Sequence, residues 1–188
     1  MPANREAPVL ETPRLILRAH REEDFEPLAA MWAHPLVTRY IGGRPASAEE
    51  SWSRLLRYIG HWPVVGFGYW AVEAKGRAGF VGEIGFADYK RNIVPPLDGM
   101  PEIGWALAPT IHGRGYATEA ALAVTAWGDS HLRAARTTCI IHPNNVASIR
   151  VAERCGYREA HRTSYKEQPT IVFVREASQG AEAYNCIP

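Results

Sequence analysis

Gly113 and Gly115 stand between a predicted strand and a predicted helix. They constrain the fold of this chain more than any other residues do. The segment from Glu102 to Pro109 has the pattern of a strand stopped by proline, and a helix follows the glycines at once. The N-terminus of a helix presents unpaired N–H groups and a partial positive charge, which attract anions. Glycine lets the backbone approach a phosphate closely. The sequence therefore predicts a phosphate-binding turn, with a tight turn that binds nothing as the alternative.

The common nucleotide-binding motifs do not fit this turn. A dinucleotide fingerprint needs a third glycine where the chain has Thr118, and an acidic residue at the end of the next strand, where Ala135 and Arg136 stand. The Gly-Lys-Ser/Thr of a phosphate-binding P-loop occurs nowhere. The anion expected here belongs to another class of ligand.

Hydrophobic periodicity places further elements on both sides of the turn. Ser47 and Glu50 form a capping box that starts one of the helices. A proline-containing segment, 90–101, is long enough to be a candidate substrate-binding lid. We expect helices at 22–32, 47–62, 115–132 and 145–155, and strands at 15–18, 67–73, 78–86, 102–108, 136–141, 157–165 and 170–175.

This order predicts an α/β fold, with a mixed central sheet of about seven strands flanked by about four helices. A length of 188 residues fits one domain. We expect a flexible leader at 1–13, the domain at 14–175 and a C-terminal tail at 176–188.

Composition excludes several functional classes. With 21 basic and 20 acidic residues the chain lacks the basic excess of a nucleic-acid binder. It shows no secretory signal and no apolar run of membrane-spanning length, so a cytoplasmic protein without a membrane partner is expected. The three cysteines are scattered, and neither a disulfide framework nor a metal site is expected.

The run from His112 to Ala120 resembles the acetyl-CoA signature of the GNAT superfamily, and most of all the branch that contains the ribosomal-protein alanine N-acetyltransferases. Thr110 stands where the family has Gln or Arg, which removes one side-chain contact. Three other segments are similar to the same branch in register and order, so that the likeness spans residues 11–175: 11–18, 145–148 and 154–157.

The resemblance implies that acetyl-CoA is the co-substrate, and that its pyrophosphate lies on the main-chain amides of the glycine loop. The implied contacts of the loop are His112, Gly113, Arg114, Gly115, Tyr116, Ala117 and Thr118. On the preceding strand, main-chain groups of Trp105, Ala106 and Leu107 are implied to pair with the pantetheine arm and to offer an N–H to the developing oxyanion. Gly104 is consistent with a close backbone approach there.

The leaving thiolate needs a proton donor. Many members of the family have a tyrosine for this at the position of Ala152, whereas the resembled branch implies Ser148. Asn145 and Ser148 are three residues apart on one helix face, so both are candidates for contacting CoA. The alternative is that Asn145 only caps the helix and Ser148 is a first-turn residue.

The incoming amine must lose a proton before it attacks. Glu102, at the start of the strand beside the reacting carbonyl, is the leading candidate for the general base, and Glu83 on the preceding strand is its competitor. The alternative for either residue is a solvated charge at the end of a strand, with no part in catalysis.

The resemblance implies direct transfer to a primary amine in a ternary complex, by a monomer or homodimer. A protein N-terminal α-amino group is one acceptor, and a small-molecule amine such as an antibiotic or amino-acid analogue is another. Because the usual tyrosine is missing, a catalytically silent CoA-binding sensor is a third hypothesis.

Overall fold

The computed structural model describes residues 6–76, 79–97 and 99–178. Within them, eight strands form one sheet in the order β1-β2-β3-β4-β5-β6-β8-β7. Neighbouring strands are antiparallel, except that β5 and β6 are parallel. The strands are β1 (Leu10–Glu11), β2 (Leu15–Arg18), β3 (Tyr69–Ala74), β4 (Phe80–Ala87), β5 (Glu102–Leu107), β6 (Arg136–Ile141), β7 (Arg158–Tyr165) and β8 (Gln168–Glu176).

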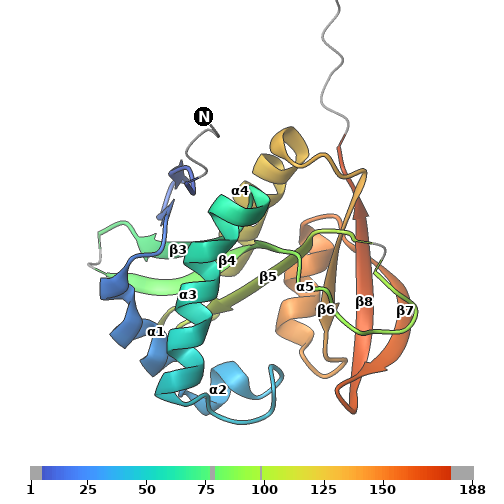
Figure 1. Ribbon diagram of the computed structural model, residues 1–188, viewed down its shortest axis with the longest axis horizontal. Coiled ribbons are helices and arrows are strands. Elements are labelled where there is room, and N and C mark those ends of the chain that lie inside the picture. The colour runs from blue at the N-terminus through green and yellow to red at the C-terminus, as the bar shows by residue number, and fades with distance from the viewer. Residues whose placement is uncertain (1–5, 77–78, 98, 179–188) are drawn as a thin grey trace, which may run out of the picture.

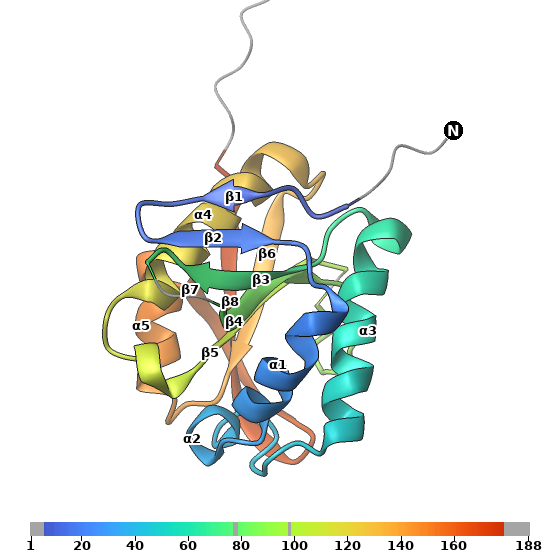
Figure 2. The same cartoon turned by 90° about the vertical axis from the view of Figure 1, so that its left-hand side faces the viewer.

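Helices cover both faces of this sheet (Figures 1 and 2). On one face α1 contacts β4 and α3 contacts β3, while on the other α4 contacts β4 and β5 and α5 contacts β6. Short 3₁₀ turns, η1 and η2, precede α1 and α4. The helical segments are η1 (Glu22–Asp24), α1 (Phe25–Trp32), α2 (Pro35–Thr38), α3 (Ala48–Val65), η2 (Pro109–Ile111), α4 (Tyr116–His131) and α5 (Val146–Arg154).

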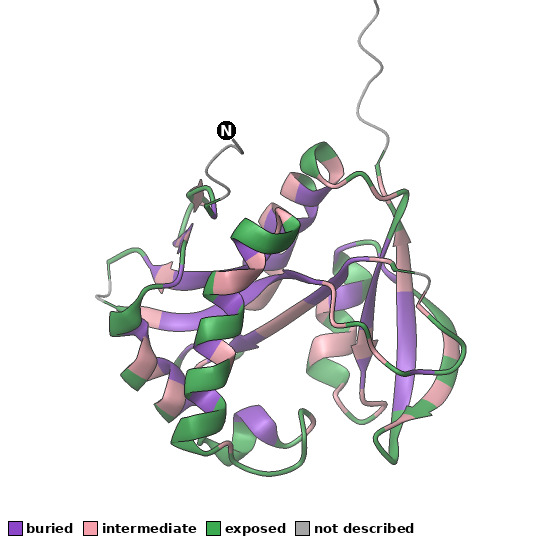
Figure 3. Ribbon diagram, viewed as in Figure 1, coloured by how far each residue is buried: buried purple, intermediate pink, exposed green. Residues whose placement is uncertain are grey.

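Each face has its own hydrophobic core, because successive residues of a strand point to opposite sides. Trp70 and Ile84 belong to the core beneath α4 and α5, whereas Tyr69 belongs to the core beneath α1 and α3. The central strands are therefore buried on both faces, as Figure 3 shows. Glu83 directly precedes Ile84 on β4, so its side chain lies on the opposite face, where it contacts Trp32 of α1 and Tyr58 of α3.

The longest helix, α3, forms where the sequence predicts it. Ser47 is its N-cap, and the capping box is confirmed, since Ser47 Oγ accepts from the N–H of Glu50 at 3.1 Å and the Glu50 carboxylate accepts from the N–H of Ser47 at 2.8 Å. The helix ends at Gly66, whose φ of 84° is the left-handed conformation that glycine adopts without strain.

The α/β class and the mixed sheet are confirmed, with one strand and one helix more than predicted. The additional strand, β1, lies inside the segment expected as a flexible leader and pairs with β2. Ala7 in the same segment is buried. The additional helix is the single turn of α2. At the other end β8 runs to Glu176, and the Ala177 N–H donates to Ala135 O at 2.8 Å. Residues 1–5 and 179–188 lie outside the described part of the chain.

Candidate active site

The central feature of the site is the divergence of β5 from β6, visible in Figure 1. Along the described residues the two parallel strands pair only at Glu102 with Thr138. At that end Thr138 donates its N–H to Pro101 O at 3.0 Å. Beyond it the strands separate and leave one side of β5 open.

The direction of main-chain groups along β5 follows from the same pairing. Ala108 N–H donates to Val81 O on the β4 side at 2.8 Å, whereas Pro101 O points to β6. Because main-chain groups alternate between the two sides of a strand, those of Trp105 and Leu107 face the opening and those of Ala106 face β4. Of the three residues expected to pair with a ligand, two therefore present their main chain to it.

The glycine loop joins this open strand to α4. Gly113 and Gly115 have φ of 74° and 79°, in the left-handed region that favours glycine. Gly115 is the N-cap of α4, and its side-chain-free position leaves the first N–H groups of the helix accessible. His112 Nε2 lies 2.8 Å from Leu107 O, and so ties the loop back to β5.

Arg14 fixes the loop from outside. Its guanidinium donates to Arg114 O at 2.9 Å and to the Glu119 carboxylate at 2.6 Å, and it stacks over the Tyr116 ring at 4.4 Å. The loop conformation is therefore held without any ligand contact, which is the preorganisation that an anion site requires.

Helix α5 begins beside the open strand. Asn145 is its N-cap, because Asn145 Oδ1 accepts from the Ser148 N–H at 3.2 Å. Both residues also line the cavity described next, so capping and ligand contact are compatible. Ala152 is fully buried, and Tyr157 is buried with its hydroxyl 2.7 Å from Thr137 Oγ1.

A cavity of about 530 Å³ lies between α2, α3, the divergent ends of β5 and β6, the start of α5 and the β7–β8 turn. It brings together six of the residues singled out in the sequence: Glu83, Glu102, Gly104, Trp105, Asn145 and Ser148. The predicted residues that lie outside its lining are Ala106, Leu107, His112, Gly113, Arg114, Gly115, Tyr116, Ala117 and Thr118. The candidate catalytic groups thus lie in one cavity, and the glycine loop lies apart from it at the start of α4.

Glu83 is buried in this cavity with only 1% of its surface exposed. Its Oε1 accepts from the Tyr58 hydroxyl at 2.5 Å and from Trp32 Nε1 at 3.2 Å. Its Oε2 has no hydrogen-bond partner among the described residues. Burial raises the pKa of Glu83 to about 7, although the nearby Arg54 guanidinium favours the charged form.

Glu102 has a different environment. Both of its oxygens accept from the Arg91 guanidinium, at 2.5 and 2.6 Å, and Arg91 also donates to the Tyr165 hydroxyl at 3.2 Å. Burial lowers the pKa of Arg91, but the hydrogen bonds and charge of Glu102 and Tyr165 together outweigh it, so that the pKa is raised. A carboxylate held in this way has few lone pairs left for a proton.

Sequence patterns indicated few of the groups that surround Glu83. Trp32 fits the apolar stripe of its helix and is indeed buried. Tyr58 lies on the buried face of α3, three residues after Leu55, and that spacing was a usable signal. Arg54 offered none, because an arginine on an amphipathic helix usually faces solvent.

Comparison with known proteins identifies the family. The sequence model described as "Acetyltransferase (GNAT) domain" matches residues 14–158. This chain belongs to the GNAT acetyltransferases. It is similar to the "Uncharacterized N-acetyltransferase YoaA" of Bacillus subtilis (strain 168), with 28% identity over 81% of this chain and 84% of YoaA.

Solved GNAT structures show the same fold. An acetyltransferase from Agrobacterium tumefaciens strain C58 is 27% identical, with a TM-score of 0.77 over 91% of this chain and 95% of its own. RimL, a ribosomal L7/L12 α-N-protein acetyltransferase in complex with coenzyme A, has a TM-score of 0.70 over 92% of this chain and 100% of its own. RimL is 16% identical, which shows a shared fold.

Membership of the GNAT family implies acetyl-CoA as the co-substrate, and the residues present fit it. The open edge of β5 offers main-chain groups to an extended pantetheine arm, and the loop at Gly113 has room for a phosphate, since an added Cβ there would meet no atom within 4 Å. Among the described residues no cluster of His, Cys, Asp and Glu is suited to a metal ion. No helix in the described ranges is long and apolar enough to cross a membrane.

Proposed function

We propose that this GNAT protein transfers an acetyl group from acetyl-CoA directly to a primary amine bound in the cavity. The observation that supports this most is Glu83, a buried carboxylate that lines the cavity together with the open strand β5 and has one oxygen without a hydrogen-bond partner among the described residues. Acetyl-CoA supplies the activated carbonyl and the thiolate leaving group. The chain has to bind both substrates, deprotonate the amine and stabilise charge on the carbonyl oxygen.

The donor side consists of main-chain groups. N–H groups at Gly113, Gly115 and the first turn of α4 would hold the pyrophosphate. The main chain of Trp105 and Leu107 would pair with the pantetheine arm, and one of their N–H groups would donate to the oxyanion. Ala106 is a weaker candidate for that contact because its main chain faces β4.

Glu83 is the better candidate for the general base, ahead of Glu102. Its free Oε2 has room for a proton, and a pKa of about 7 leaves a substantial fraction ionised at neutral pH. Glu102 instead forms the bidentate pair with Arg91, which suits a positioning residue. In this mechanism Glu83 accepts one proton from the ammonium, and the neutral nitrogen then attacks the carbonyl carbon.

Ser148 remains the candidate for the group that protonates the departing sulfur. Its hydroxyl gives its proton to the thiolate and takes up in return the second proton of the nitrogen, which is lost as the tetrahedral adduct collapses to the amide. Ser148 lies in the first turn of α5 and lines the same cavity. Tyr157, which follows the end of α5, is a poor alternative, because it is buried outside the cavity lining and burial raises its pKa.

Two acceptor classes fit this chemistry, a peptide N-terminus and a small-molecule amine. The third hypothesis, a silent CoA-binding sensor, is disfavoured by Glu83. A sensor has no need of a buried carboxylate with a raised pKa beside the acetyl site, and such groups concentrate at catalytic sites.

The test compares Glu83→Gln with Glu102→Gln in a CoA-release assay over a panel of N-terminal peptides, free amino acids and aminoglycosides. Wild-type kcat/KM should rise with pH up to about 7, as Glu83 ionises. Loss of a general base costs roughly 10²–10⁴-fold, and the loss in Glu83→Gln should shrink as the pH approaches the pKa of the amine. Glu102→Gln should give a loss that does not depend on pH.

Two outcomes would contradict this assignment. If Glu102→Gln shows the pH-dependent defect and Glu83→Gln does not, Glu102 is the base. If neither variant shows it, the amine loses its proton to solvent and the protein contributes mainly positioning.

A further inference from the structure

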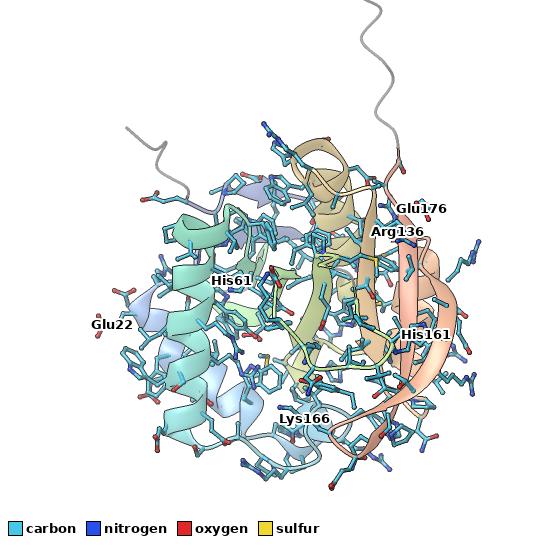
Figure 4. All side chains as sticks on the ribbon, turned by 45° about the vertical axis from the view of Figure 1, so that its right-hand side comes forward. Glu22, His61, Arg136, His161, Lys166 and Glu176 are labelled. Atoms are coloured by element: carbon cyan, nitrogen blue, oxygen red, sulfur yellow. The ribbon has the colours of Figure 1, made fainter. Side chains whose placement is uncertain are left out.

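The acceptor cavity has an unusual charge for a protein with a net charge of +1. Its charged lining comprises five basic residues and two acidic ones, an excess of three positive charges: Arg39, Arg54, Arg57, Arg91 and Lys166 against Glu83 and Glu102. Figure 4 shows Lys166 at the β7–β8 turn, across the cavity from α3. The positive groups therefore come from both walls.

The two carboxylates form an ion pair with only one of these basic groups in the described residues. Glu102 is paired with Arg91, whereas Glu83 forms no ion pair, although Arg54 and Arg57 are near enough to favour its charged form. Across the described residues, four of the basic side chains form no ion pair: Arg39, Arg54, Arg57 and Lys166. Other arginines of this chain form ion pairs with carboxylates, Arg18 with Asp24 and Arg175 with Asp129.

Arg54 is the most informative of the four. Its guanidinium carbon lies 3.6 Å from the centroid of the Trp32 ring, the same ring system that donates to Glu83. Its terminal nitrogen is 3.5 Å from the Tyr58 hydroxyl, which also donates to Glu83. Arg54 is thus held beside the candidate base by the residues that hold that base.

Arg54 also has a donor without a partner. Its Nε is buried, and among the described residues no acceptor reaches it. A buried guanidinium N–H with no acceptor is costly, and a negatively charged oxygen is the partner that it binds most strongly. Arg54 and Glu83 both line the cavity, and each has one buried polar atom without a partner among the described residues, Arg54 Nε suited to an anion and Glu83 Oε2 to an ammonium.

We propose that the acceptor of this enzyme carries an anionic group close to its amine, and that Arg54 binds that group while Glu83 receives the amine. Arg39, Arg57 and Lys166 surround the approach and attract the same negative charge. The inference rests on the proposed acetyl transfer and names its substrate class. It excludes polycationic amines such as aminoglycosides, which the same charges repel.

A carboxylate near an amine occurs in a free amino acid and at a peptide N-terminus with an acidic residue. Matched acceptor pairs distinguish these two sources. The first pair is alanine and alaninamide, and the second is two short amidated peptides that begin Ala-Glu and Ala-Gln. We expect the anionic member of one pair to be acetylated with a kcat/KM at least about tenfold higher, since charge-assisted hydrogen bonds exceed neutral ones.

Arg54→Gln should raise KM for the anionic acceptor by roughly 10- to 100-fold and leave KM for the neutral member of the pair nearly unchanged. Because Arg54 also favours the charged form of Glu83, any fall in kcat should be the same for both members of the pair. Arg54→Lys should restore part of the loss. Arg133→Gln removes the same charge from an exposed position outside the cavity and should change nothing. The thermal shift caused by acetyl-CoA should be equal in all of these variants, which separates acceptor binding from donor binding.

The inference is overturned if neutral or cationic acceptors are used as well as anionic ones, or if Arg54→Gln raises KM equally for both members of a pair. Should Arg54→Gln fail to fold, the exposed Arg57→Gln gives the same comparison. Added salt should then raise KM for the anionic member only. Acetyl-CoA binding with no acetylation of any amine would overturn the proposed function, and this inference with it.

Discussion

The environment of Glu83 predicts an effect on stability that can be measured without any substrate. The pKa of Glu83 is raised from 4.5 to about 7 because the carboxyl is buried. A group whose pKa is higher in the folded state contributes stability below its unfolded pKa and loses that contribution as the pH rises through its folded pKa. The free energy of unfolding of the wild type should therefore fall between about pH 4.5 and pH 7.

The size of the effect follows from the shift. About 2.5 pKa units at 1.36 kcal/mol each correspond to about 3 kcal/mol, most of which is lost between pH 5 and pH 8. Glu83→Gln removes the titrating group and keeps an oxygen that can accept from Tyr58 and Trp32. The free energy of unfolding of the variant, relative to that of the wild type, should therefore increase by about 2–3 kcal/mol from pH 5 to pH 8. Any effect of the amide that does not depend on pH leaves this increase unchanged.

Urea unfolding of both proteins at several pH values from 5 to 8 gives the required difference. His20, whose pKa burial lowers to about 4, titrates in both proteins and cancels. The exposed Glu153→Gln is the matched control and should show no gain with pH. A difference between Glu83→Gln and wild type that stays constant with pH would show that this carboxyl keeps an ordinary pKa, and the argument for its role as base would fail with it.

Two further predictions concern the donor side. Gly113→Val should leave a folded protein, destabilised by about 1–2 kcal/mol because of its φ of 74°, and should abolish the rise in melting temperature that acetyl-CoA gives the wild type. A dinucleotide that stabilises the wild type more than acetyl-CoA does would contradict this assignment of the loop. Ser148→Ala should slow turnover by roughly 10²–10⁴-fold while the thermal shift with acetyl-CoA is kept. Full activity of Ser148→Ala in steady-state kinetics would assign the proton on sulfur to water.

Local patterns were sufficient to predict most of the fold. The strand at Arg136–Ile141 has the predicted bounds, and α5 begins after its predicted cap, Asn145. The patterns did not predict β1 and α2, which are too short to show a repeating pattern of apolar residues. β1 has two residues in a segment with several prolines, and α2 has four residues that begin with Pro35. Elements of that length are stabilised by their neighbours, in this case β2 and α1, and not by their own sequence.

The site was predictable to a smaller degree. Glycine in the left-handed conformation and the order strand–loop–helix are local properties, so the loop at Gly113 and Gly115 could be found from the sequence. The divergence of β5 from β6 could not, because it depends on where two strands far apart in the chain stop pairing. The free oxygen of Glu83 depends in the same way on Trp32 and Tyr58, which come from two helices.

The segment 90–101, expected as a lid, contacts both Glu102 and strand β7. Arg91 at its start holds Glu102, and Val94 O accepts from Thr163 Oγ1 on β7 at 2.6 Å. The segment is thereby attached both to β5 and to the β7–β8 hairpin, and Arg91 and Tyr165 are part of the cavity wall. Because Arg91 occupies both oxygens of Glu102, it leaves Glu83 as the carboxylate of this cavity with an oxygen free for a proton. In the proposed mechanism the segment acts through the carboxylate that Arg91 occupies, an effect that does not require it to open and close.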